Sequence, residues 1–295
     1  MRAMTRIGVV GAGRVGAVLA AALREAGHEI VAVAGESHAS RTRIDTLLPG
    51  VRVAKPTAVS RACDLLLLTV PDDMLSNVVT MLAASGAIRE GQYVVHTSGK
   101  HGLSVLQPAA DVGAHVLAMH PAMTFTGTDL DLTRLDGCVY GVTAEPETEH
   151  LAVRLVTDLR GRVVRVEEDR RALYHAGLAH GANHLVTLVA QAMDLLRASG
   201  ADDPAATLRP LLTAALDNAL EYGSAALTGP IVRGDVETVR AHLRDIAANR
   251  PATLESYVAM ARATANQAVV DGRLLPIRAA KLVGILNDAL VEVEA

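Results

Sequence analysis

The stretch IGVVGAGRVG, residues 7–16, decides the fold of the first half of the chain. Its apolar part is typical of a strand, and its glycines have the spacing Gly-x-Gly-x-x-Gly at the start of a helical stretch. In this pattern Gly11 permits a tight turn, Gly13 lets the backbone approach a pyrophosphate, and Gly16 lets the helix pack on the strand. The helix N-terminus offers free amide groups and a partial positive charge to an anion.

A dinucleotide is the ligand that this strand, turn and helix favour. A glycine-rich turn without a ligand is the alternative. The orderly succession of strand, turn, helix and second strand argues against it. The predicted cofactor-binding residues of the loop are Gly11, Gly13, Arg14, Val15 and Gly16.

Short apolar runs continue beyond this loop and alternate with helical or polar stretches. The predicted strands are Arg6–Val10, Glu29–Ala34, a weaker Val51–Val53, Asp64–Val70, Tyr93–His96, Val116–Met119, Val139–Val142 and Val163–Val166. Continuous apolar runs of this length are typical of strands that are buried on both faces. We therefore predict an α/β dinucleotide-binding domain over residues 1–167, with a Rossmann-type, doubly wound parallel sheet.

From about residue 168 the chain has long Ala- and Leu-rich segments with helical spacing, separated by Gly and Pro. The predicted helices are Ala172–Ser199, Ala205–Leu227, Val236–Ala247, Leu254–Asp271 and Arg278–Glu292. We predict an all-helical domain over residues 168–295 that binds substrate and forms a dimer. A chain of 295 residues is long for one core, which also favours two domains.

The composition argues against several classes of protein. Half of the residues are apolar and a fifth are charged, as in folded globular proteins. The net charge is −4 and no basic stretch is present, so we expect no nucleic-acid partner. No apolar run reaches a membrane span and the start does not resemble a signal peptide, so we expect a cytoplasmic protein without a membrane partner. Cys63 and Cys138 are then expected to be buried free thiols.

The end of the second predicted strand bears on which dinucleotide binds. The sequence there is VAVAGESHASRTR, residues 31–43. Glu36 lies slightly beyond the position where NAD sites carry an acid. Ser37, Ser40, Arg41 and Arg43 follow it. A cluster of this kind suits a 2′-phosphate, so we expect NADP through Ser37 and Arg41, with NAD as the alternative. The same arginines would also fit a solvated helix start.

Two other strand ends contribute predicted site residues, because open parallel sheets bind ligands at the carboxyl ends of their strands. Val70 and Pro71 would line the ribose and nicotinamide, although a proline that ends a strand needs no further reason. Thr97 and Ser98 end the next strand, and Ser98 is predicted to hydrogen-bond the nicotinamide amide or the substrate. A turn hydroxyl is the alternative for Ser98.

Residues 173–184, LYHAGLAHGANH, are rich in histidine. His180 and His184 lie one helical turn apart, but two ligands are too few and we expect no metal. On a helical wheel Asn183 belongs to one polar stripe of an otherwise apolar helix, so we predict a buried helix whose stripe faces a substrate cleft. Histidines suit proton transfer near neutral pH, which makes His175 and His180 candidates together with His120. Bracing of the packing is the alternative role for these histidines.

Four further motifs carry a resemblance that extends over nearly the whole chain. They are VVHTSGKHGLSVL (94–106), VLAMHPAMTFTG (116–127), LYHAGLAHGANHLVTL (173–188) and LTGPIVRGD (227–235). The series resembles a bacterial Rossmann-like oxidoreductase family whose C-terminal helical domain long had no assigned function. This family is related to the pyrroline-5-carboxylate reductases and the 6-phosphogluconate dehydrogenase-like superfamily, and some members are alternative ketopantoate reductases.

The resemblance implies hydride transfer between NADP and a small carboxylate-bearing substrate, with ketopantoate as the specific expectation, and a homodimer built through the helical domain. In the wider superfamily the first helix of the second domain carries a lysine and an asparagine that bind the reacting oxygen. Asn183 matches the asparagine, whereas Ala179 stands where the lysine would be. Asn183 is thus implied to be catalytic, and the proton must come from another residue, such as His120 or His175.

The motif LTGPIVRGD is expected to form a shaped loop between two helices, because it contains Gly229, Pro230 and Gly234. Arg233 is predicted to bind the substrate carboxylate, and His180 to contact the substrate. Capping of the neighbouring helices is the alternative, and Asp235 is a natural N-cap for a helix that begins at Val236.

The predicted function is an NADP-dependent reductase of a small oxo acid. Two alternatives stay open. One is an imine reductase of the pyrroline-5-carboxylate kind. The other is a sensor that binds NADP without turnover, which the missing lysine suggests.

Overall fold

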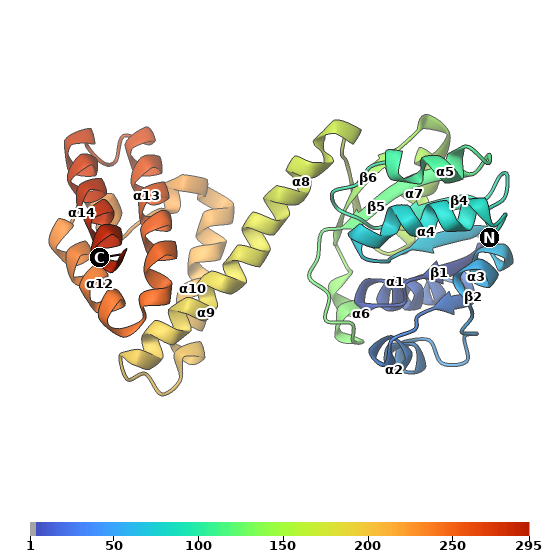
Figure 1. Ribbon diagram of the computed structural model, residues 1–295, viewed down its shortest axis with the longest axis horizontal. Helices are drawn as coiled ribbons and strands as arrows, with labels where there is room; N and C mark the ends of the chain where they lie inside the picture. The colour runs from blue at the N-terminus through green and yellow to red at the C-terminus, as the bar shows by residue number, and fades with distance from the viewer. Residues whose placement is uncertain (1–3, 295) are drawn as a thin grey trace. The chain divides into compact units, whose positions relative to one another are not determined.

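The computed structural model describes residues 4–294 (Figure 1). Its internal contacts divide the chain into two compact units, Met1–Ala182 and Asn183–Ala295. Within residues 4–294, no helix is long and apolar enough to cross a membrane.

The first unit is built on a seven-stranded sheet with the order β2-β1-β3-β4-β5-β6-β7. The strands are β1 (Arg6–Val10), β2 (Glu29–Ala34), β3 (Leu65–Leu68), β4 (Tyr93–His96), β5 (His115–Pro121), β6 (Val139–Ala144) and β7 (Arg162–Arg165). The helices of this unit are α1 (Arg14–Glu25), α2 (His38–Leu47), α3 (Pro56–Ala62), α4 (Asp72–Ala84), α5 (Gln107–Ala110), α6 (Leu130–Arg134), α7 (Pro146–Asp158) and α8 (Arg171–Leu178).

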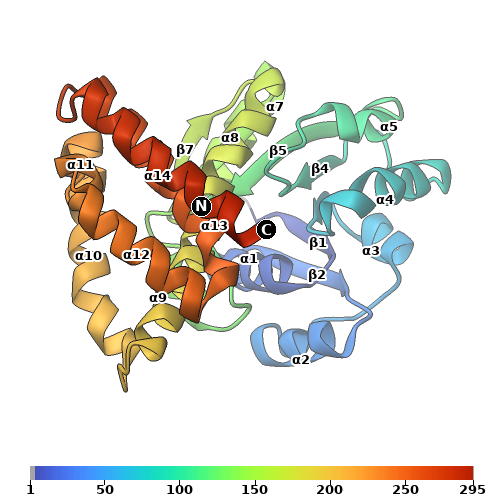
Figure 2. The same cartoon turned by 60° about the vertical axis from the view of Figure 1, so that its left-hand side comes forward.

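The alternation of β3 shows how the helices cover both faces of the sheet. Leu65 and Leu67 pack into a core with α1 and α7, whereas Leu66 and Leu68 pack on the other side with α3 and α4 (Figure 2). A strand buried on both faces has no polar side, which is why its sequence is a continuous apolar run. This arrangement confirms the predicted doubly wound Rossmann-type fold. Cys63 and Cys138 are buried and free, as predicted.

The sheet departs from the expected all-parallel pattern in one pair of neighbours. β5 and β6 are antiparallel, with His120 opposite Gly141. A parallel strand needs a crossover that returns to the other end of the sheet, usually through a helix. The segment between β5 and β6 contains only α6, which has five residues. The weak strand predicted at Val51–Val53 is reduced to a single bridge between Val33 and Val53.

The second unit is built from α-helices. These are α9 (His184–Ala198), α10 (Pro204–Tyr222), α11 (Pro230–Arg233), α12 (Val236–Asn249), α13 (Leu254–Val270) and α14 (Pro276–Glu294). α12, α13 and α14 surround a core that includes Val239, Val258 and Leu282 (Figure 1). The predicted helices match these elements closely, except that Ala205–Leu227 extends beyond the end of α10.

The predicted helix Ala172–Ser199 required two corrections. A π-helical turn, η3 (Ala179–Asn183), interrupts it between α8 and α9. An extra residue in a turn shifts the faces of the helix that follow, so a wheel drawn with one period does not hold across it. The helix was also expected to be buried, yet α9 has no buried residue within the chain.

Candidate functional site

The glycine loop after β1 is held in close contact with the end of β3. Gly11 has φ +100°, and a methyl group added there would lie 2.7 Å from the backbone of Thr69 and Val70. The Thr69 hydroxyl donates a hydrogen bond to the Gly11 carbonyl at 2.7 Å. A methyl group on Gly16 would collide with that hydroxyl and lie 2.5 Å from the Gly11 carbonyl oxygen. Gly11 and Gly16 are therefore glycines for reasons of packing within the protein.

Gly13 differs from its neighbours in the loop. A methyl group added to Gly13 would meet protein only at 3.8 Å, at the Gly11 carbonyl oxygen. Its φ of −79° is open to any residue. The protein itself thus does not require glycine at this position, at the N-cap of α1. A group that approaches the backbone from outside, such as a pyrophosphate, would require it.

Two arginines, Arg14 of α1 and Arg43 of α2, converge at Gly127. A methyl group on Gly127 would lie 2.6 Å from Nε of Arg43 and 2.9 Å from Cγ of Arg14. The loop that contains Gly127 is fixed by the buried carboxylate of Asp131, which accepts bonds from the backbone amides of Thr126 and Gly127 at 2.8 and 2.7 Å. Within residues 4–294, neither arginine has a hydrogen bond or ion pair to a protein group. Unpaired cations that share one neighbour favour an anionic ligand.

Ser37 and Arg41 take different positions from Arg43. Ser37 is the N-cap of α2, where it accepts a bond from the Ser40 amide at 3.1 Å and donates to the Ser40 hydroxyl at 2.9 Å. Arg41 is exposed, whereas Arg43 is half-buried. Arg43 therefore lies beside Arg14 of the glycine-loop helix, at Gly127. The sequence analysis did not select Arg43 as a cofactor ligand.

The carboxyl ends of β3 and β4 carry the other predicted cofactor residues. Val70 is half-buried and Pro71 is the N-cap of α4. Thr97 and Ser98 follow β4, where the Ser98 hydroxyl accepts a bond from the His101 amide at 3.2 Å. The turn interpretation of Ser98 is thus supported, and its hydroxyl hydrogen stays available for another acceptor.

His96 fixes this turn from the inside. Its Nδ1 accepts a bond from the Ser98 amide at 3.1 Å, so Nε2 carries the proton and donates to the Gly102 carbonyl at 2.8 Å. Burial above all, together with the nearby Arg171, lowers the pKa of His96 to about 4. His96 is therefore neutral at pH 7 and braces the loop.

Two of the predicted catalytic histidines meet at Gly99, next to Ser98. A methyl group on Gly99 would collide with the His175 ring and lie 3.1 Å from Nε2 of His120. The two imidazole rings are 5.9 Å apart and nearly perpendicular. His120 comes from the end of β5 and His175 from α8. The structure thus brings Ser98, His120 and His175 together at the carboxyl edge of the sheet.

A tyrosine and an arginine from α8 complete this cluster. The Tyr174 hydroxyl lies 3.1 Å from Nδ1 of His120. Arg171 is fully buried and donates to the Ser98 carbonyl at 2.6 Å and to the Thr143 hydroxyl at 2.9 Å. Because residues three and four apart share one face of a helix, Arg171, Tyr174 and His175 all face the sheet. We name Ser98, His120, Arg171, Tyr174 and His175 the α8 cluster.

The electrostatics of the α8 cluster favour neutral imidazole at His120. Burial above all, together with the Arg171 guanidinium and His175, lowers the pKa of His120 to about 4. Asp72 acts in the opposite direction but less strongly. At pH 7 His120 can donate or accept a hydrogen bond, but it has no imidazolium proton to give.

Sequence reasoning missed Tyr174 and Arg171. Both lie in or beside the histidine-rich stretch, at the spacing that places them on the same face as His175. That spacing was the available signal. The prediction considered only the histidines of this stretch and not the tyrosine at the same spacing. Arg171 was not expected in a site because an arginine near a helix start is usually solvated.

Asn183 and Arg233 belong to the helical unit. Asn183 ends the π-helical turn and is exposed, as is His180 in the same turn. Arg233 is exposed at the end of α11, between Gly229 (φ +95°) and Gly234 (φ +68°). The shaped loop predicted for this motif is therefore present. Asp235 caps α12 by accepting a bond from the Thr238 amide at 3.1 Å, which confirms its predicted capping role.

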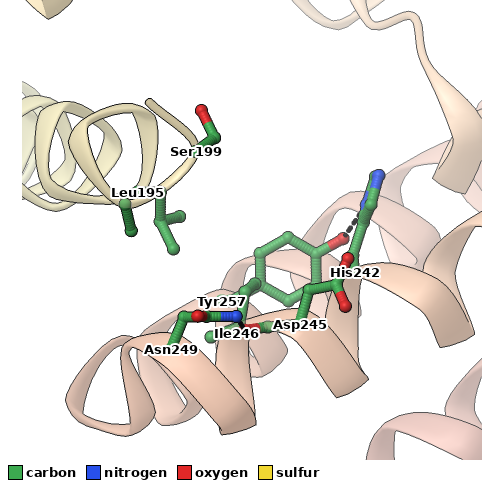
Figure 3. A pocket seen from close by; sticks show the side chains of 8 residues that line it. Leu195, Ser199, His242, Asp245, Ile246, Asn249 and Tyr257 are labelled. Atoms are coloured by element: carbon green, nitrogen blue, oxygen red, sulfur yellow. Dashed lines mark hydrogen bonds between the residues drawn. The ribbon is translucent and has the colours of Figure 1, made fainter. Parts of the chain in front are cut away.

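The helical unit also contains a cavity of about 550 Å³ (Figure 3). Leu195 of α9 and Ser199, the C-cap of that helix, line one side, and His242 and Tyr257 lie across from them. Tyr257 and Nδ1 of His242 are joined by a hydrogen bond of 2.8 Å. None of the predicted site residues lines this cavity. Among residues 4–294, no group of three or more His, Cys, Asp or Glu side chains is placed to hold a metal ion.

The comparisons with protein families agree with this two-part architecture. The model of a Rossmann-like domain matches residues 1–121, and the model of a domain of unknown function, DUF2520, matches residues 138–264. Together they confirm the family resemblance: the chain joins a Rossmann-like domain to a DUF2520 domain. A search of curated proteins finds no match.

Solved structures share the fold at low sequence identity. A candidate NADP oxidoreductase from Bacteroides fragilis is 22% identical, with a TM-score of 0.77 over 89% of this chain and 98% of that one. An imine reductase from Myxococcus stipitatus in complex with NADP⁺ is 17% identical, with a TM-score of 0.65 over 91% and 95%. Pyrroline carboxylate reductase from Plasmodium falciparum with NADP bound is 12% identical, with a TM-score of 0.58 over 96% and 99%.

The different surroundings of Gly13 and Gly16 give a direct test of the dinucleotide site. Gly13→Ala should leave the thermal unfolding midpoint within about 2 °C of wild type but weaken NADPH binding at least about tenfold, because only the ligand needs that space. Gly16→Ala should lower both the thermal unfolding midpoint and the affinity for NADPH, because its methyl group collides with Thr69. Thermal unfolding and titration of NADPH fluorescence measure the two effects. Unchanged NADPH affinity in folded Gly13→Ala would contradict the assignment.

Proposed function

We propose that this protein is an NADP-dependent oxidoreductase that reduces a small oxo acid, with ketopantoate as the first substrate to test. The observation that carries the proposal is the α8 cluster. It gathers Ser98, His120 and His175 at the carboxyl edge of a Rossmann sheet, where ligands bind in such folds. The glycine loop ends at the same edge of the sheet.

The proposed cofactor is NADP, because the loop after β1 and the arginines at Gly127 suit its phosphates. Gly13 leaves backbone space for the pyrophosphate, and Arg14 and Arg43 would hold the 2′-phosphate. Ser37 and Arg41 remain proposed ligands from the sequence. When bound, NADPH supplies a hydride at its nicotinamide ring. The two related structures named above with NADP or NADP⁺ bound support this choice.

The residues of the α8 cluster divide the work of carbonyl reduction. His175 is proposed to donate the proton to the substrate oxygen, because His120 is neutral at pH 7. His120 and Ser98 are proposed to orient the oxygen through hydrogen bonds. Asn183, His180 and Arg233 keep the substrate roles assigned from the sequence, with Arg233 as the carboxylate ligand.

An imine reductase is the second candidate, because relatives of the same fold include pyrroline carboxylate reductase and imine reductases. Both reactions need a hydride and a proton, and a nicotinamide and a histidine can supply them. A sensor that binds NADP without turnover is the third candidate. The alanine at position 179, where the superfamily carries lysine, motivates it.

A homodimer through the helical unit is also proposed. α9 and α10 expose large apolar side chains that a monomer would leave in water. They include Val186, 69% exposed, and Leu220, 79% exposed. Leu188, Leu211 and Leu216 add to this surface. Apolar surfaces of this kind favour association.

The activity itself is tested by following NADPH absorbance with purified protein, with ketopantoate, other oxo acids and a cyclic imine as substrates. We expect NADPH oxidation with an oxo acid. His175→Ala should lower kcat at least about a hundredfold if it supplies the proton. Clear NADPH binding without oxidation on a wide panel of substrates would support the sensor instead.

Arg43→Met should weaken NADPH binding about tenfold to a hundredfold, because one charge-assisted hydrogen bond to phosphate is lost, and should leave NADH binding nearly unchanged. Arg41→Met is the matched control, and we expect a smaller loss because Arg41 is exposed. Both affinities are measured by titration. An equal loss for NADPH and NADH would mean that Arg43 does not read the 2′-phosphate.

Leu220→Lys should shift the protein toward monomer in light scattering at micromolar concentration, because a charge would be buried at the proposed interface. Val270→Lys is the control, since Val270 is 80% exposed on α13, outside α9 and α10. A wild-type protein that is monomeric at this concentration would disprove the dimer.

A further inference from the structure

Tyr174 of α8 contacts both of the antiparallel strands β5 and β6. Its ring lies over Gly141 on β6, where a methyl group would be 2.5 Å from the ring carbon Cζ. Its hydroxyl lies 3.1 Å from Nδ1 of His120, on the neighbouring strand β5. Gly141 and His120 stand opposite each other in the antiparallel pair. The glycine thus provides the space through which Tyr174 reaches the histidine.

The protonation state of the phenol bears on which group is the donor in the contact between Tyr174 and His120. Burial raises the pKa of Tyr174, so the phenol keeps its proton at neutral pH. The O–H of Tyr174 is then free to donate to Nδ1 of His120. A neutral imidazole that accepts at Nδ1 must carry its hydrogen at Nε2.

The Nε2–H of His120 has no partner in the part of the chain that the structure describes. It lies 3.1 Å from the position of an added methyl group at Gly99, beside the end of β4. Nε2 of His120 is not a buried atom, so a group from outside can reach it. This is a single, fixed donor directed to the edge of the sheet where the proposed reaction takes place.

The charges around His120 also favour a carbonyl substrate over a positively charged one. Arg171 is a buried cation in the α8 cluster and His175 adds to its effect, while Asp72 is the acid that counters them. A positive environment stabilises an oxygen that gains negative charge during hydride transfer. The same environment disfavours a substrate that already carries positive charge.

We propose that Tyr174 is a positioning residue that fixes His120 as the Nε2–H tautomer, and that this donor selects a carbonyl oxygen over an iminium nitrogen. This inference rests on the proposed function, because it concerns the substrate of the same site. A carbonyl oxygen accepts the Nε2–H bond, whereas a protonated imine presents an N–H of its own and cannot. The substrate class is therefore an oxo acid, not a cyclic iminium acid.

The tautomer is measured by nitrogen NMR of the full-length protein labelled with ¹⁵N-histidine, at pH 7 and without substrate. His120→Gln identifies the His120 signals by their loss. We expect wild-type His120 to have a protonated Nε2 and an unprotonated Nδ1. Tyr174→Phe should give a mixture of both tautomers. Gly141→Ala displaces the Tyr174 ring without removing its hydroxyl, and it should give the same result if Tyr174→Phe does not fold.

Tyr140→Phe is the matched control. Tyr140 is buried on β6 next to Gly141, but its hydroxyl has no partner and it forms no bond to His120. Its removal should leave the His120 tautomer unchanged and kcat/KM within about twofold of wild type. A wild-type His120 protonated at Nδ1, or a tautomer that does not change in Tyr174→Phe and Gly141→Ala, would overturn the positioning role.

Selection between substrates is measured as kcat/KM for an oxo acid and for a cyclic imine such as pyrroline-5-carboxylate. Wild type should prefer the oxo acid, and Tyr174→Phe should lower its kcat/KM about tenfold, as expected for one lost hydrogen bond, with a smaller effect on the imine. An imine that is reduced as well as the oxo acid in wild type overturns the selection. If neither is reduced, the proposed function fails, and the NMR result still decides the role of Tyr174.

Discussion

The buried guanidinium of Arg171 is the interaction on which the candidate site depends. No ion pair to it is formed within residues 4–294, and it donates to the Ser98 carbonyl and the Thr143 hydroxyl, while its Nε has no partner. An arrangement of this kind costs desolvation energy, so it persists only where the surrounding groups are rigidly placed. It joins the turn after β4, the strand β6 and the first turn of α8. The positions of Tyr174 and His175 follow from that attachment.

The fold could be predicted almost completely from the sequence, because its signals are local. The apolar run at Leu65–Leu68 and the glycines after β1 are features of short segments that need no distant partner to be read. The antiparallel direction of β6 is different, since it depends on the path of the chain between two strands. The short helix α6 was not visible as a signal there. The π-helical turn at Ala179–Asn183 was also hidden, because its sequence fits a regular helix.

The candidate site was only half predictable, for the same reason. Ser98, His120 and His175 could be selected because they carry chemistry at strand ends or on a marked helix. Their convergence at Gly99 could not, since it depends on how α8 docks on the sheet. Arg43 and Gly127 illustrate the limit further. They lie far apart in the sequence, and only the loop fixed by Asp131 brings the glycine to the arginine. The cation pair that suits an anion is therefore a property of the tertiary structure.

The missing lysine at position 179 has a different meaning once α8 is known. A reductase needs hydrogen-bond donors and a positive field near the reacting atom, but it does not need them from a particular residue. Arg171, Tyr174 and His175 lie on the turns of helix that precede Ala179, and together with His120 they offer a cation, a phenol and imidazole groups. The absence of lysine removes one donor from a helix that presents several others. It is therefore a weak argument for a protein that binds NADP without turnover, and the Nε2–H proposed for His120 is an argument for chemistry at a carbonyl.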